Sequence, residues 1–121
     1  MGERTGTTFS EKIKANKEKL KSTLKGKSVV GLSAPAKGNT LLNYCEIDLP
    51  YIGEINELKI GKFTPGRHIP VVHEDQIIED QPDYVLILAW NWSDYLIQHM
   101  REKGYRGKFI IPIPEPEIIG G

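Results

Sequence analysis

The residues best suited to chemistry form the run Gly31-Leu32-Ser33-Ala34-Pro35-Ala36-Lys37-Gly38-Asn39-Thr40. This run follows a short apolar segment and precedes a predicted helix. A strand, a glycine-bounded turn and a helix N-terminus leave backbone N–H groups pointing outward at the positive end of the helix dipole. Lys37 adds a full positive charge. The run predicts either a phosphate site or a plain strand-to-helix connection, because such turns need Gly and Pro in any case.

Standard nucleotide-binding motifs fit this run only in part. The phosphate loop of nucleoside triphosphatases needs Gly-Lys followed by Ser or Thr, whereas the order here is Lys37-Gly38-Asn39. The dinucleotide fingerprint G-x-G-x-x-G meets Gly31, Ser33 and Ala36, so only its first glycine is kept. Glu54 follows Gly31 by about twenty residues, where that fold often places an acid on a ribose hydroxyl. A degenerate NAD-binding domain is therefore one hypothesis, with a solvated carboxylate as the alternative for Glu54.

Further candidate residues follow other predicted strands. Asn56 comes just after the second strand. Trp90 and Asn91 follow the apolar run 84–89 and would offer an aromatic face and an amide to a base or sugar, or else close the core as a lid. His68 lies in a loop rich in Pro and Gly and is the best candidate for acid–base chemistry or a phosphate contact, with a plain surface residue as the alternative. His73 and His99 are expected at the surface, and no His, Cys or carboxylate group has metal-ligand spacing.

Alternating strands and helices must position these candidates. The sequence predicts strands over 28–32, 51–55, 69–72, 84–89 and 108–111, and helices over 9–24, 40–46, 74–79 and 93–103. The unbroken apolar run 84–89 is typical of a parallel strand that is covered on both faces. We therefore expect an α/β fold, a small Rossmann-like, doubly wound and mainly parallel sheet with flanking helices. Ligands bind outside the carboxyl ends of such strands, so the candidates should share one rim.

Composition limits the possible partners. Sixteen Lys and Arg balance sixteen Asp and Glu, and this zero net charge removes the general electrostatic reason to expect nucleic acid or an anionic membrane as partner. Cys45 is the single cysteine among 121 residues, so neither an intramolecular disulfide nor a cysteine zinc site is expected. No apolar run is long enough to cross a bilayer and no secretory signal opens the chain, so a cytoplasmic location is the default expectation.

The chain divides into three predicted segments. Residues 1–8 are expected to be a disordered lead-in, residues 9–25 an amphipathic helix, and residues 26–121 the domain itself. Phe9, Ile13, Leu20 and Leu24 recur on one narrow face of the helix. The lysines around them indicate a solvated face rather than a nucleic-acid patch, because no aromatic residues are interleaved.

Four blocks of the sequence resemble one known family, the C-terminal domain of the sugar C-methyltransferases. The blocks run over residues 34–45 (APAKGNTLLNYC), 61–70 (GKFTPGRHIP), 82–91 (PDYVL to AWN) and 112–116 (PIPEP). They occur in the family's order and spacing, and the resemblance covers nearly everything from Gly26 to Ile119. It departs at Ser33 and Glu46, where family members commonly have glycine.

The resemblance implies that this chain is one part of a larger enzyme. In the family, a small zinc-binding domain and a central S-adenosylmethionine-binding methyltransferase domain precede a Rossmann-like domain that helps to hold a nucleotide-linked deoxysugar. The general base belongs to the central domain. The chain alone is therefore expected to be non-catalytic, with no cofactor of its own, a nucleotide-diphosphate sugar as ligand, and a methyltransferase domain in the same parent chain or in a separate subunit as partner.

The leading hypothesis is thus a nucleotide-sugar-binding domain. The predicted substrate-binding residues are Ser33, Ala34, Pro35, Ala36, Lys37, Gly38, Asn39, Thr40, Glu54, Asn56, His68, Trp90 and Asn91. Lys37 and the neighbouring amides would hold the diphosphate, and the loop of His68 would close over it. The alternative from another class is an interaction module whose helix 9–24 packs on a catalytic partner.

Overall fold

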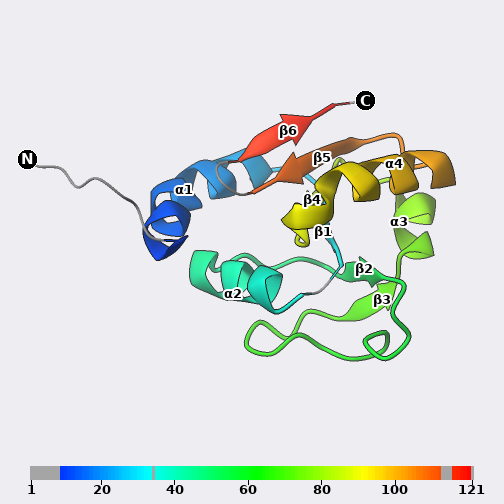
Figure 1. The fold of residues 1–121 in the computed structure, drawn as a ribbon, viewed down its shortest axis with the longest axis horizontal. Helices are drawn as coiled ribbons and strands as arrows, with labels where there is room; N and C mark the ends of the chain where they lie inside the picture. Colours follow the sequence, from blue (N-terminus) through cyan, green and yellow to red (C-terminus); the bar gives the residue numbers. More distant parts are fainter. Residues whose placement is uncertain (1–8, 34, 113–115, 121) are drawn as a thin grey trace, which may run out of the picture.

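The chain folds into a six-stranded sheet with helices on both faces (Figure 1). This computed structural model describes residues 9–33, 35–112 and 116–120. The elements are α1 (Phe9–Leu24), β1 (Val29–Leu32), α2 (Ala36–Cys45), β2 (Ile52–Glu54), β3 (Val71–His73), α3 (Asp75–Asp80), β4 (Tyr84–Ile87), the 3-10 turn η1 (Trp90–Trp92), α4 (Ser93–Lys103), β5 (Lys108–Ile111) and β6 (Glu117–Ile119). The predicted α/β, mainly parallel fold is confirmed.

The strand order places two neighbouring strand ends at the centre of one rim. The order across the sheet is β3-β2-β1-β4-β5-β6. All neighbouring pairs are parallel except β5 with β6, which is antiparallel. The direction in which the chain adds strands reverses between β1 and β4. The carboxyl ends of β1 and β4 therefore flank the topological switch point, where open α/β sheets bind their ligands.

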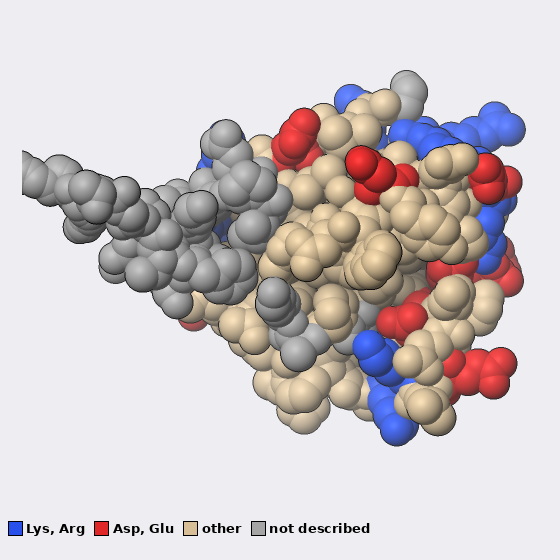
Figure 2. Space-filling model, viewed as in Figure 1, with Lys and Arg blue, Asp and Glu red and all other residues tan. Residues whose placement is uncertain are grey.

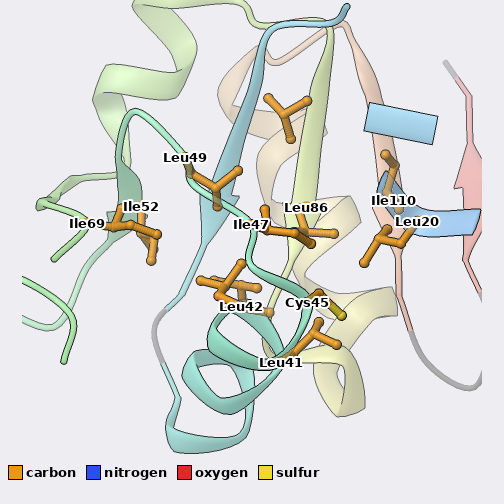
Figure 3. Packing of buried hydrophobic residues seen from close by; sticks show 12 residues of the cluster. Leu20, Leu41, Leu42, Cys45, Ile47, Leu49, Ile52, Ile69, Leu86 and Ile110 are labelled. Atoms are coloured by element: carbon orange, nitrogen blue, oxygen red, sulfur yellow. The ribbon is translucent and has the colours of Figure 1, made fainter. Parts of the chain in front are cut away.

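Both faces of the sheet are buried, as the apolar run in β4 predicted. Leu86 and Leu88 pack with α1 and α2 on one face, whereas Val85 and Ile87 pack with α3 and α4 on the other. Figure 3 shows the first of these cores, with Leu41, Leu42 and Cys45 of α2 and Leu20 of α1 among its members. Residues two apart along a strand point to the same face, so one continuous apolar strand supplies both cores.

Helix α1 belongs to the same packed unit as the sheet. Leu20 is 1% exposed, and Leu24 packs against the core formed with α2. Part of the apolar stripe of α1 is thus covered by the domain itself. None of the helices in the described ranges is long and apolar enough to span a membrane.

Two expectations about the elements were wrong. Helix α2 begins at Ala36, one turn before the expected start at Thr40. Its first turn contains Gly38, whose low helix propensity hid the start, and packing against the sheet outweighs that propensity. The expectation that 108–111 is the last strand was also wrong, because β6 follows it at the edge of the sheet. An antiparallel edge strand accommodates flanking prolines, since one of its sides needs no hydrogen bonds.

Candidate functional site

A cavity of about 580 Å³ lies between the start of α2 and the segment that links β2 to β3. We call it the loop cavity. It is lined by Pro35, Asn39, Thr40, Ile52, Lys59, Lys62, Phe63, Thr64, Pro65, Val71 and Leu88. Its size lies within the usual range of small-molecule sites.

The loop cavity combines an apolar floor with polar walls. Ile52, Val71 and Leu88 are at most 4% exposed and form the floor. Lys59 and Lys62 bring two positive charges to the wall, and within the described part of the chain no carboxylate lines the cavity. Two cations above an apolar floor favour a ligand that carries both an anionic group and an apolar ring.

Gly38 allows α2 to start directly above strand β4. A Cβ atom at this position would lie 2.7 Å from Cβ of Leu88 and 3.1 Å from its carbonyl oxygen. Any larger residue would push the first turn of α2 away from the sheet. The backbone N–H of Asn39 donates to the carbonyl of Pro35 at 3.0 Å, which closes that first turn. The glycine therefore sets the height of Asn39 and Thr40 in the cavity wall.

The segment over the cavity is held by backbone hydrogen bonds to β3. Gly61 N–H donates to the carbonyl of Val71 at 2.8 Å, and Val71 N–H donates to the carbonyl of Lys62 at 2.9 Å. Thr64 is buried, and its hydroxyl oxygen accepts from the N–H of Ile69 at 3.0 Å. These hydrogen bonds hold the backbone of residues 61–64, which carries side chains of the cavity wall, in one conformation.

Two side-chain contacts tie the same segment to α2 and the chain that follows it. Asn43 Nδ2 donates to the carbonyl of Pro65 at 3.3 Å. Arg67 makes a two-pronged ion pair with Asp48, with N···O distances of 2.9 and 2.7 Å. The hydrogen bond from Arg67 lowers the pKa of the Asp48 carboxyl below its ordinary value. The segment over the loop cavity is thus fixed both to α2 and to the chain that follows it.

A second, smaller hollow of about 310 Å³ lies at the switch point on the other side of the rim. Ser33, Ala89, Trp92, Tyr95 and Leu96 line it, and we call it the switch hollow. Trp92 is 67% and Tyr95 62% exposed. Figure 2 shows this face with an uncharged centre, over the start of α4, and with charged side chains gathered toward the α3 end. The switch hollow is therefore an apolar, aromatic surface, unlike the loop cavity.

A buried carboxylate supports the helix that carries these aromatic residues. The Tyr95 ring stacks on His99 with centroids 5.8 Å apart. His99 Nε2 lies 2.6 Å from Glu74 Oε2, and Lys103 Nζ donates to the same oxygen at 2.9 Å. Lys103 also pairs with Asp75. His99, which was expected at the surface, has a side chain that is 28% exposed, and it contacts a Glu74 side chain that is only 4% exposed.

The residues of the opening run are divided between several places. Pro35, Asn39 and Thr40 line the loop cavity, whereas Ser33 lines the switch hollow. Gly38 packs on Leu88, as described above. Ala34 and the side chains of Ala36 and Lys37 lie outside the described part of the structure, so the role predicted for Lys37 stays a prediction.

The remaining predicted site residues lie in neither hollow. Oε2 of Glu54 accepts hydrogen bonds from the N–H groups of Ile55 and Asn56, both at 3.0 Å. Asn91 is exposed, and Trp90 is partly buried and packs against the core of α1 and α2. The side chains of Glu54, Asn56, Trp90 and Asn91 thus lie at or after the ends of β2 and β4 and line neither hollow.

His68 lies on the loop but is not among the residues that line the loop cavity. It is exposed, its backbone adopts a left-handed conformation with φ of +57°, and its N–H donates to the carbonyl of Thr64 at 3.0 Å. A histidine in a left-handed position is uncommon, and here it completes the turn between Thr64 and Ile69.

Sequence reasoning missed the cationic and aromatic wall of the loop cavity. Lys59, Lys62, Phe63 and Thr64 come from the long connection, where no periodicity shows which side chains point inward. The available signal was two lysines beside Gly61 in a loop that leads into a strand. In the described ranges, no group of three His, Cys, Asp or Glu side chains could hold a metal ion.

Comparison with known proteins identifies what this domain is similar to. Residues 3–114 match the family model of the C-methyltransferase C-terminal domain. The C-methyltransferase NovU of Streptomyces niveus is 40% identical over 98 residues, which cover 78% of this chain and 23% of that protein. The chain thus spans about a quarter of the length of this curated relative.

Proposed function

The chain belongs to the family of C-methyltransferase C-terminal domains, and we propose that it binds the nucleotide-diphosphate sugar on which such an enzyme acts. The observation that carries the proposal is the loop cavity, in which Lys59 and Lys62 stand above an apolar floor with no carboxylate among the described lining residues. A sugar nucleotide has the matching chemistry, since its diphosphate is anionic and its base is a flat ring. The exposed ring of Phe63 offers that base a face.

On this proposal the chain alone does not methylate. S-adenosylmethionine and the group that deprotonates the sugar would belong to a methyltransferase domain, in the same parent chain or in a separate subunit. The rim of this chain offers little to a nucleotide cofactor of its own. A Cβ at Gly31 would lie within about 3 Å of the side chains of Ile52 and Leu88, so this glycine serves core packing rather than the approach of a phosphate.

A titration with dTDP and UDP tests the proposal. We expect amide resonances of residues 31–40 and 59–65 in the labelled protein to shift first, because these two segments face each other across the cavity. Replacing both lysines (Lys59→Gln with Lys62→Gln) should weaken dTDP binding about thirtyfold, as each of the two lost charged contacts costs about 1 kcal/mol at a partly exposed site.

A matched control separates a specific site from general charge. Lys25→Gln with Lys27→Gln removes the same charge from two exposed lysines that precede β1, at the opposite end of the sheet. This pair should bind dTDP as the parent does. If both double variants weaken binding equally, or if no shift appears at millimolar dTDP, the chain does not bind nucleotides at the loop cavity.

The second candidate function is that of an interaction module. The exposure of Trp92 and Tyr95 at the switch hollow favours it, since large exposed aromatic residues on one patch often mark an interface. The occupant would be the methyltransferase domain, and nucleotide binding would need both domains. A tandem protein that binds dTDP while this chain does not would favour the interaction module, and Trp92→Ser should then weaken binding by the tandem protein.

A further inference from the structure

The amide of Asn39 is a polar group of the loop cavity that the protein itself does not satisfy. Its Oδ1 is buried and has no hydrogen-bond partner among the described residues. Its neighbours in the cavity lining are largely apolar, because Ile52, Val71 and Leu88 form the floor. A buried carbonyl oxygen without a donor destabilises the folded protein, so its presence calls for an explanation.

The position of Asn39 is imposed by the fold and not by the needs of the helix. The helix bond of this residue uses the backbone N–H, which donates to Pro35. Gly38 presses the turn onto Leu88 and so brings the side chain of its neighbour to the cavity wall. Asn also has a lower helix propensity than Leu or Ala. Neither stability nor capping accounts for an asparagine here.

Asn43, one turn later on α2, shows what a structural asparagine does in this domain. Its Nδ2 donates to the carbonyl of Pro65, and its side chain packs against Gly66. Asn43 thus fastens the loop to the helix. Asn39 lines the cavity without such a bond among the described residues. Its Oδ1 is covered in the ligand-free protein, so a turn of the side chain would present this acceptor to a molecule inside.

We infer that Asn39 is a specificity-determining residue whose Oδ1 accepts a hydrogen bond from an N–H or O–H group of the bound ligand. The inference rests on the proposed function, because Lys59 and Lys62 would hold the anionic part of the same molecule. A sugar nucleotide has two sources for the donor. One is the imide N3–H of a thymine or uracil base, and the other is a hydroxyl of the sugar.

Substitution at Asn39 should separate binding from folding. Asn39→Leu removes a buried acceptor that has no partner, so the thermal midpoint of the ligand-free protein should stay the same or rise. Asn43→Leu is the matched control, and it should lower that midpoint because it removes a bond to the loop. A structural role for Asn39 predicts the reverse, a lower midpoint for Asn39→Leu.

Three ligands distinguish the two sources of the donor. dTDP is compared by calorimetry with its 3-methylthymine analogue, which lacks N3–H, and with dTDP-glucose, which adds sugar hydroxyls. If the base is the donor, the parent should bind the methylated analogue about three- to tenfold more weakly than dTDP, and Asn39→Leu should bind the two alike. If the sugar is the donor, the parent should prefer dTDP-glucose over dTDP by the same factor, and Asn39→Leu should lose that preference.

The outcomes of this experiment keep the two proposals apart. If Asn39→Leu preserves both ratios while Lys59→Gln with Lys62→Gln weakens all three ligands, the inference about Asn39 is wrong and the nucleotide site stands. If the parent binds none of the three ligands, the proposed function itself fails. Asn43→Leu should keep both ratios of the parent, whatever its effect on overall affinity.

Discussion

Gly38→Ala tests how closely α2 must sit on the sheet. The added Cβ would lie 2.7 Å from Leu88 Cβ, whereas carbon atoms pack best at about 3.5–4.0 Å, so the first turn of α2 must move outward by about 1 Å. The atoms in the way are the Cβ and backbone of a buried residue, and they cannot rotate aside. We therefore expect an overpacking cost near the upper end of the usual range, about 2–3 kcal/mol.

Helix propensity works in the opposite direction at Gly38 and has to be subtracted. Alanine is favoured over glycine inside a helix by about 1 kcal/mol. The net loss in the free energy of unfolding should then be about 1–2 kcal/mol, which corresponds to a midpoint lower by about 5 °C for a domain of this size. Urea denaturation followed by circular dichroism measures it.

Ser22→Ala serves as the control, since Ser22 lies on an exposed face of α1 and should gain a few tenths of a kcal/mol from propensity alone. The affinity of Gly38→Ala for dTDP should fall as well, because Asn39 and Thr40 move with the turn. A Gly38→Ala protein more stable than the parent by about 1 kcal/mol would refute the reasoning, because it would show that α2 has room above Leu88.

Three further predictions concern the stability of the domain. Ser33 has a φ of +68°, which a β-branched residue tolerates poorly, so Ser33→Gly should keep or raise the thermal midpoint and Ser33→Val should lower the stability by about 1–2 kcal/mol. A hydrogen bond from the N–H of Ser28 lowers the pKa of Asp83, so its stabilising contribution is present above the unfolded-state pKa and is lost as the pH falls through the folded-state pKa. Asp83→Asn should therefore lose less stability between pH 5 and pH 2.5 than the parent, as urea midpoints at the two values will show. Glu74→Gln should cost about 1–3 kcal/mol in urea denaturation because two donors of α4 share this buried carboxylate, whereas Glu79→Gln, on an exposed residue, should have almost no effect.

The sheet could be predicted from the sequence because its signals are local. The apolar run of β4 indicated a strand covered on both faces, and the two cores divide its residues as that prediction requires. The alternation of strands and helices predicted the parallel order. The resemblance to the C-methyltransferase C-terminal domains is also confirmed, since residues 3–114 match the family model.

The candidate site was harder to predict from the sequence, because the features that build it are not local. The fingerprint comparison assigned the third glycine position to Ala36, yet the residue that lets the helix approach the sheet is Gly38. Helix α2 starts one turn early, and this start alone brings Asn39 into the first turn. Lys59 and Lys62 reach the cavity through a loop whose path depends on hydrogen bonds to β3, which no periodic pattern in the loop reveals.

The loop cavity follows from one departure in the way that the sheet is wound. Parallel neighbours such as β2 and β3 are normally joined by a helix that covers one face of the sheet. Here residues 55–70 connect β2 to β3 without an α-helix (Figure 1). They lie on the same face of the sheet as α2, the helix that connects β1 to β2. Ile52 and Val71 are therefore covered by a loop and not by a helix, and a hollow remains above them. The loop contributes two lysines and a phenylalanine to the lining of this hollow. A helix in that place would fill the hollow with its own apolar side chains. The missing helix thus creates the space, the loop supplies the charge, and the closely packed start of α2 supplies the hydrogen-bond acceptor, which is why we place the ligand there rather than at the aromatic switch hollow.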